Sequence, residues 1–177
     1  MKKTNNPLYP YIITIVLKQL GALERVLGKA ATYSKEKNIP EIAILEWRMF
    51  HDMFNFKRQI QIATDDARRN LYLLAGKEHI KFDDKEKTFK ELKNRIIKTK
   101  KLIQKLKSTD FKGAELRHIS LYWMGDSYVR GKEFVNEFLI QNLSFHVVTA
   151  YNILRAHGVS IGKADYTGPL SMKKKSK

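Results

Sequence analysis

The chain has no cysteine, few prolines and glycines, and no long uninterrupted hydrophobic run. Without cysteine it can form neither a disulfide nor a thiol nucleophile, and zinc sites built from cysteine are excluded. The longest apolar run, YIITIVL at residues 11–17, is far too short to span a bilayer. No apolar segment with a cleavage site follows the basic start of the chain, so we expect a cytoplasmic protein without a secretory signal or a membrane partner.

What the sequence does have is enough apolar residues for one core. The 177 residues are 43% hydrophobic, which predicts a single domain at residues 1–168 and a disordered basic tail at residues 169–177. The net charge of +16 would attract polyanions in a salt-dependent way. Eleven of the 28 residues from 85 to 112 are Lys or Arg. No aromatic residues interleave with them and no recognition motif is present, so the sequence does not favour a nucleic-acid partner.

Amphipathic periodicity predicts an all-α fold, a four-helix bundle. Apolar residues recur every three or four positions in four segments. These segments lie near residues 8–34, 53–75, 88–106 and 132–158.

The connections between these segments differ in character. KEHIKFDDKEK, residues 77–87, predicts a polar loop, and HISLYWMGDSYVRG, residues 118–131, predicts a short β-hairpin between the third and fourth helices. The segment VSIGKADYTGPLS, which follows Gly158, is expected to be irregular and to pack back onto the bundle.

Two polar residues interrupt the apolar stripe of the fourth helix. A helical projection places Asn142 and His146 at its centre, where a core helix normally carries Leu. An unpaired buried amide or imidazole costs roughly 1–3 kcal/mol, so both need partners. In the second helix, Asp52, Gln59 and Asp66 recur every seven residues at the edge of the apolar face. A cluster of Gln59 or Asp52 with Asn142 and His146 would form an inward-facing pocket for a small molecule.

The same residues leave other functions open. Imidazole titrates near neutral pH, which makes His146 the candidate catalytic acid or base. A lone core histidine is more often structural, and the bundle would then be non-enzymatic, with polar residues that fix helix register. A metal needs about three good ligands, and only His51 or Asp52, at the mouth of the bundle, could join His146. The aspartate pairs 65–66 and 83–84 are expected to be solvated.

Four stretches of the chain, in this order along the sequence, resemble those of a known protein family. They are DMFNFKRQIQIATDDAR, TFKELKNRI, FKGAELR and FLIQNLSFHVVTAYNILRAHGVSIGKADYTG. Together they resemble an uncharacterised bacterial and fungal domain-of-unknown-function family in the DinB/YfiT-like superfamily. The resemblance covers residues 9–168 and is most specific from Asn142 to Gly168.

This resemblance implies a DinB/YfiT-like four-helix bundle that is often a homodimer. In better-understood branches, three histidines from the second and fourth helices hold a divalent metal, and the proteins are thiol-dependent transferases or isomerases of small molecules. His146 matches one fourth-helix ligand position, and Asn142 stands at the other. Gln59 or Gln61 stands near the second-helix position. Amides are poor ligands for zinc or nickel, so we expect a polar pocket with absent or weakly held metal.

Overall fold

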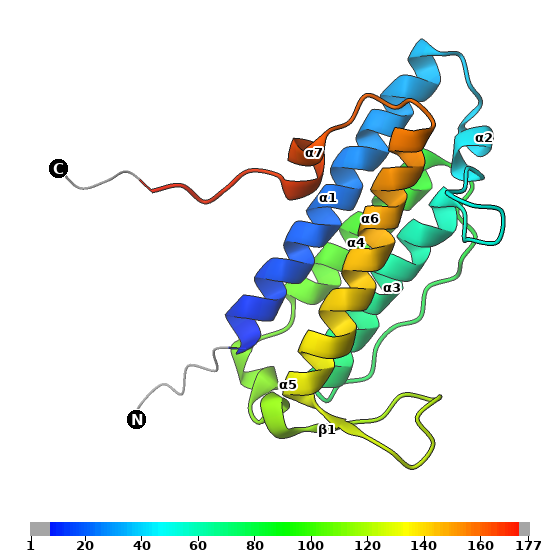
Figure 1. The fold of residues 1–177 in the computed structure, drawn as a ribbon. Helices are drawn as coiled ribbons and strands as arrows, with labels where there is room; N and C mark the ends of the chain where they lie inside the picture. Colours follow the sequence, from blue (N-terminus) through cyan, green and yellow to red (C-terminus); the bar gives the residue numbers. More distant parts are fainter. Residues whose placement is uncertain (1–7, 174–177) are drawn as a thin grey trace.

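A computed structural model of the protein describes residues 8–173, in which four long helices form a bundle (Figure 1). The long helices are α1 (Leu8–Glu36), α3 (Phe56–Leu74), α4 (Phe89–Gln104) and α6 (Ile140–Ala156). The shorter elements are α2 (Glu41–Leu45), the 3-10 helices η1 (Ser108–Phe111) and η2 (Ala114–Leu116), the strands β1 (His118–Ile119) and β2 (Val129–Arg130), α5 (Gly131–Glu133), the π-helical η3 (Phe134–Leu139) and α7 (Lys163–Thr167). The predicted all-α bundle is confirmed, and none of its helices in residues 8–173 has the length and apolar character needed to cross a membrane.

The chain runs up through α1, down through both α3 and α4, and up again through α6 (Figure 1). Helices α1 and α6 run side by side in the same direction, because Gln19 contacts Ser144 and Tyr33 contacts His157. Helices α1 and α3 both pack against α4 and α6 and make few contacts with each other. The pairs α1 with α3 and α4 with α6 therefore lie diagonally across the bundle.

Helix α4 follows α3 in the chain, and yet the two helices run parallel. Arg95 Nε donates to Thr64 Oγ1 at 2.7 Å, and the Tyr72 hydroxyl donates to the Leu102 carbonyl at 3.2 Å, so residue numbers rise together along both helices. Two parallel neighbours require a connection that returns along the bundle. Residues 75–88, which contain the predicted polar loop, form this connection, called the crossover below (Figure 1).

The N-cap residue of α3 determines where this helix starts. This start shows that one prediction is wrong. The Asn55 side chain accepts a hydrogen bond from the Arg58 backbone N–H, and Asn55 itself has extended backbone angles. An N-cap of this kind ends the preceding loop and begins the helix. Asp52 therefore lies before α3, and the predicted stripe of Asp52, Gln59 and Asp66 is wrong at its first member.

The segment predicted as one fourth helix begins at Gly131 and contains a π-helical stretch, η3, before α6. A side chain at residue 131 would collide with the Ala114 carbonyl oxygen, so this close approach requires glycine. Just before it, β1 and β2 pair antiparallel, with His118 opposite Arg130. The predicted hairpin is present, but each strand has only two residues, and residues 120–128 form its loop.

The segment after α6 packs back onto the bundle, as expected, but it is not irregular throughout, because Lys163–Thr167 forms α7. Arg25 on α1 donates to the Asp165 carbonyl at 2.8 Å, and Gln19 donates to the Tyr166 hydroxyl at 3.2 Å. Ile161 is 5% exposed and belongs to the hydrophobic core. In the predicted tail, residues 169–173 are exposed and form neither helix nor strand, and residues 174–177, like residues 1–7 of the predicted domain, lie outside the described residues.

Candidate functional site

Two hydrogen-bonded pairs of polar side chains join α3 to α6 inside the bundle. His146 Nδ1 lies 2.7 Å from Gln59 Oε1, and Asn142 Nδ2 donates to Asp66 Oδ2. Gln59, Asp66 and His146 are 1%, 3% and 8% exposed. These two contacts are called the polar pairs below. The structure thus brings together three residues proposed from the sequence, together with Asp66.

The hydrogen bonds of Gln59 assign the tautomer of His146. Gln59 Nε2 donates to the Phe54 carbonyl at 3.1 Å, so Oε1 is the amide atom that faces the imidazole. An amide oxygen only accepts hydrogen bonds, so Nδ1 of His146 carries the proton and Nε2 keeps a free lone pair. Burial, together with the smaller effect of the Arg58 charge, lowers the pKa of His146 to about 4. The ring is therefore neutral at neutral pH.

Asp66 is a buried carboxyl, which corrects the expectation that both aspartate pairs are solvated. Burial is the main cause that raises the pKa of Asp66 to about 6; the charge of Arg69 and the hydrogen bond from Asn142 oppose this shift, and the charge of Asp65 adds to it. Arg69 Nη2 lies 2.7 Å from Asp66 Oδ1. The pair 83–84 is exposed, as expected.

The two other candidate site residues, His51 and Asp52, lie in the turn before α3 and are exposed. The ring of His51 packs against Phe50, with ring centroids 4.5 Å apart. Within residues 8–173, neither residue makes a hydrogen bond or ion pair with the polar pairs. The reason is local, because the Asn55 cap fixes where α3 starts and leaves both residues outside the helix.

The side chains at the polar pairs do not fit the metal that the resemblance implies. His146 is the one imidazole there, the amides are poor ligands for zinc or nickel, and both oxygens of Asp66 already accept hydrogen bonds, from Asn142 and Arg69. Zinc sites in proteins use three or four nitrogen, sulfur or carboxylate ligands. In the described part of the chain, no three His, Cys, Asp or Glu side chains are placed to hold one ion.

A groove of about 570 Å³ runs along the outer face of α6 and η3 and reaches the polar pairs at Asn142. Phe145 lines it, is 56% exposed, and stands edge-on to the His146 ring with centroids 5.4 Å apart. Phe138 and Val148 also line the groove. The sequence did not assign these residues to a groove, although Phe145 and Val148 are apolar side chains outside the core stripe of the helix and were a visible signal.

The comparisons with known proteins agree with this architecture. The family described as "Domain of unknown function (DUF1993)" matches residues 8–167. The crystal structure of a DinB family member protein from Shewanella denitrificans superposes with a TM-score of 0.92, at 35% sequence identity over 97% of each chain. The chain belongs to this DinB-like DUF1993 family. None of the curated proteins matches it.

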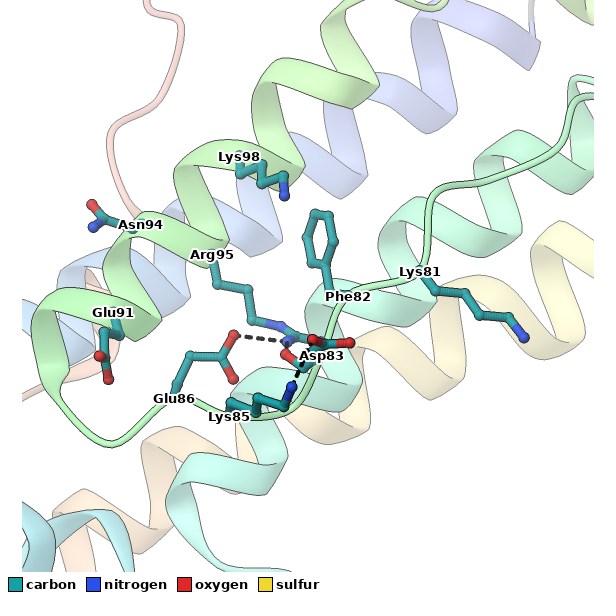
Figure 2. Close-up of a pocket in the computed structure, with 9 residues that line it drawn as sticks. All are labelled: Lys81, Phe82, Asp83, Lys85, Glu86, Glu91, Asn94, Arg95 and Lys98. Carbon is teal, nitrogen blue, oxygen red and sulfur yellow. Dashed lines mark hydrogen bonds and ion pairs between the residues drawn. The ribbon is translucent and has the colours of Figure 1, made fainter.

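In this DUF1993 chain, a second hollow of about 520 Å³ lies between the crossover and α4 (Figure 2). Figure 2 shows Arg95 reaching from α4 to Glu86, at 2.9 Å, and to the Asp83 carbonyl, at 3.1 Å. The Phe82 ring lies 4.5 Å from Lys98 Nζ and 3.8 Å from the Arg68 guanidinium. Because Arg95 is engaged on every side, it anchors the crossover to α4 and has no free donor of its own for a ligand.

Proposed function

We propose that the protein binds a small molecule at the polar pairs, with His146 as hydrogen-bond acceptor and Asn142 as a second polar contact. One observation carries the proposal: the His146 ring is held by Gln59 with its Nε2 lone pair unused by any residue in 8–173. His146 retains 8% exposure, so a small donor group could approach it. A ligand that donates to Nε2 would supply a hydrogen bond that no residue in 8–173 makes to it.

The surroundings favour a ligand with an apolar body and a donor group. Phe138 and Phe145 supply apolar surface in the groove, while Asn142 and His146 supply the polar contacts. The same chemistry argues for binding over acid–base catalysis. A general base works best with a pKa near the working pH, whereas burial lowers the pKa of His146 to about 4.

A metal-dependent, thiol-linked transferase or isomerase is the alternative that the resemblance implies. The ligand set at the polar pairs does not favour it, for the reasons of donor chemistry given above. The thiol part of that alternative is nevertheless testable, because a thiol S–H is one of the donors that Nε2 could accept.

The proposal is tested with protein carrying ¹⁵N-labelled histidine, titrated with glutathione and with a panel of small aromatic alcohols and amides. A ligand should shift the Nε2 resonance of His146, and His146→Gln should abolish its binding. His51 and His157 lie away from the polar pairs and serve as internal controls in the same spectrum. Shifts confined to these controls, or no binding by any probe, would refute the proposal.

A second candidate, a non-enzymatic homodimer, is favoured by the outer face of α6. Phe145 is 56% and Val148 is 36% exposed, and Trp123 beside Phe138 is 56% exposed. Such a face suits a self-association surface. Light scattering after size exclusion distinguishes the candidates: a dimer that Phe145→Glu converts to a monomer supports this second function, and a wild-type monomer excludes it.

A further inference from the structure

A hollow of about 220 Å³ lies where the C-terminal part of α3 meets the crossover and the hairpin loop. It is separate from the polar pairs and from the hollow of Figure 2. Basic side chains on one side of it are Arg69, Lys77 and His79, and apolar or aromatic side chains elsewhere include Leu73, Tyr122 and Trp123. No carboxylate is among the residues that line it.

One buried polar atom of a residue that lines this hollow lacks a well-formed hydrogen bond. His79 Nδ1 makes none to any residue in 8–173, although the Ile80 backbone lies near enough to favour the protonated ring. Buried donors are nearly always paired in native proteins, so such a group indicates a missing partner.

The electrostatic environment indicates the sign of that partner. Burial lowers the pKa of His79, and the positive charges of Arg68, Arg69 and Lys81 lower it further, while contact with the Ile80 backbone acts the other way. The charges that act most strongly on His79 are thus cations. A positive potential at this half-buried imidazole would favour an anion beside it.

The basic residues that line the hollow also have donors to spare. Arg69 contacts Asp66 through Nη2 and Asn70 through Nε at 3.5 Å, which leaves Nη1 free. Lys77 Nζ contacts Asp110 at 2.8 Å, and an ammonium group has three donors. Both acidic partners stand outside the lining, and an anion would share Arg69 with Asp66 and Lys77 with Asp110.

We propose that this hollow is a binding site for a small aromatic carboxylate. This proposal is independent of the function proposed for the polar pairs. Its carboxylate would lie between Arg69, Lys77 and His79, where Arg69 Nη1 and the Lys77 ammonium would donate charge-assisted hydrogen bonds to it. Its ring would pack on Leu73 and Trp123. Tyr122 and Trp123 are 96% and 56% exposed, and so leave large aromatic surfaces uncovered at the rim. The small volume limits the ligand to about one ring.

The test uses 4-fluorobenzoate and its neutral analogue 4-fluorobenzamide, titrated into the full chain and followed by ¹⁹F NMR and by the Trp123 indole signal. We expect the acid to bind and the amide to bind weakly or not at all. Lys77→Gln and His79→Gln should each weaken the acid about tenfold, the usual effect of losing one charge-assisted hydrogen bond. Lys85→Gln is the matched control, because Lys85 lies on the same crossover, is 85% exposed and does not line this hollow.

The outcomes are separable. Equal binding of acid and amide would show that the hollow has no preference for an anion. Equal weakening by Lys77→Gln and Lys85→Gln would show diffuse attraction to a basic protein. Either result, or an absence of binding, overturns the proposal. Ligand binding at His146 has its own probes, so failure here leaves the polar pairs unaffected.

Discussion

Arg69 Nη2 lies 2.7 Å from Asp66 Oδ1, although the side chain of Arg69 is 39% exposed and that of Asp66 only 4%. The contact joins the bundle interior to the rim of the hollow beside the hairpin. The contact favours the charged form of the Asp66 carboxyl, whereas burial disfavours this form. The stability of the bundle should therefore depend on pH through this residue.

Asp66→Asn should gain stability relative to the wild type as pH rises from about 4 to 7. Burial raises the pKa of Asp66 from 3.8 to about 6, so protonation favours the folded state, and this contribution is lost as pH rises through 6. The groups that act on Asp66 are Asp65, Arg69 and Asn142, and all three are retained in the variant. The difference in unfolding free energy, measured by urea denaturation, should change by roughly 2 kcal/mol. A pH-independent difference would contradict the prediction.

His146→Gln should show the opposite dependence. Burial lowers the pKa of His146 from 6.5 to about 4, so the contribution of neutral His146 is complete above pH 6.5 and is lost as pH falls through 4. The wild type should therefore lose stability relative to the variant as pH falls across this range. Because the two shifts have opposite signs, they nearly cancel in the wild type, and only the single variants reveal them. Parallel pH profiles of wild type and variant would show that the imidazole is not desolvated.

Arg95→Met should destabilise the bundle by about 3–5 kcal/mol, because it leaves carboxylates without their buried partner. The Arg95 side chain is 2% exposed and contacts Asp65, Asp84 and Glu86 at 2.8–3.0 Å. Lys98→Met, one turn along α4 and exposed, is the control and should cost about 1 kcal/mol or less. The urea midpoint measures both, and equal effects would contradict an anchoring role for Arg95.

Ile161→Ala should lower the unfolding free energy by about 2 kcal/mol or more, the usual cost of truncating a buried isoleucine. Ile161 is 5% exposed in the segment that carries α7 back onto α1. Leu170→Ala, at a position 70% exposed, should leave stability unchanged. Thermal unfolding of both variants measures the difference, and an unchanged melting temperature for Ile161→Ala would show that the segment adds no stability.

Zinc or nickel should bind the purified protein at well below one ion per chain. The polar pairs offer one imidazole, and His51 lies outside them. After incubation with either ion and desalting, elemental analysis should find the same low content in wild type and His146→Ala, while the variant unfolds at lower temperature. A full equivalent of metal in the wild type that is lost in His146→Ala would instead support the metal-dependent alternative.

The helices could be predicted from the sequence because spacing of apolar residues is a local property. Helix direction could not, since the parallel course of α3 and α4 depends on contacts such as Arg95 with Thr64 that join distant segments. The π-helical stretch η3 was also missed, because it changes backbone hydrogen bonding without changing the apolar pattern.

Most residues of the candidate site, but not all of them, could be predicted from the sequence. Asn142 and His146 stood out as polar residues in an apolar stripe, and the seven-residue spacing identified Gln59. Asp66 was misjudged as solvated because its neighbour Asp65 made the pair look like a surface feature. In the bundle Asp66 contacts Arg69 on its own helix and Asn142 on α6.

The diagonal placement of α1 and α3, and of α4 and α6, has a consequence for folding. Because α1 and α3 face each other across the bundle, the N-terminal half cannot bury its apolar stripes in a local hairpin, and the same holds for α4 and α6. Native contacts therefore join residues far apart in sequence, a topology that slows folding. During synthesis the emerging chain must wait for α6 before its core can close, so we expect its nascent N-terminal half to be protease-sensitive and a client for chaperones.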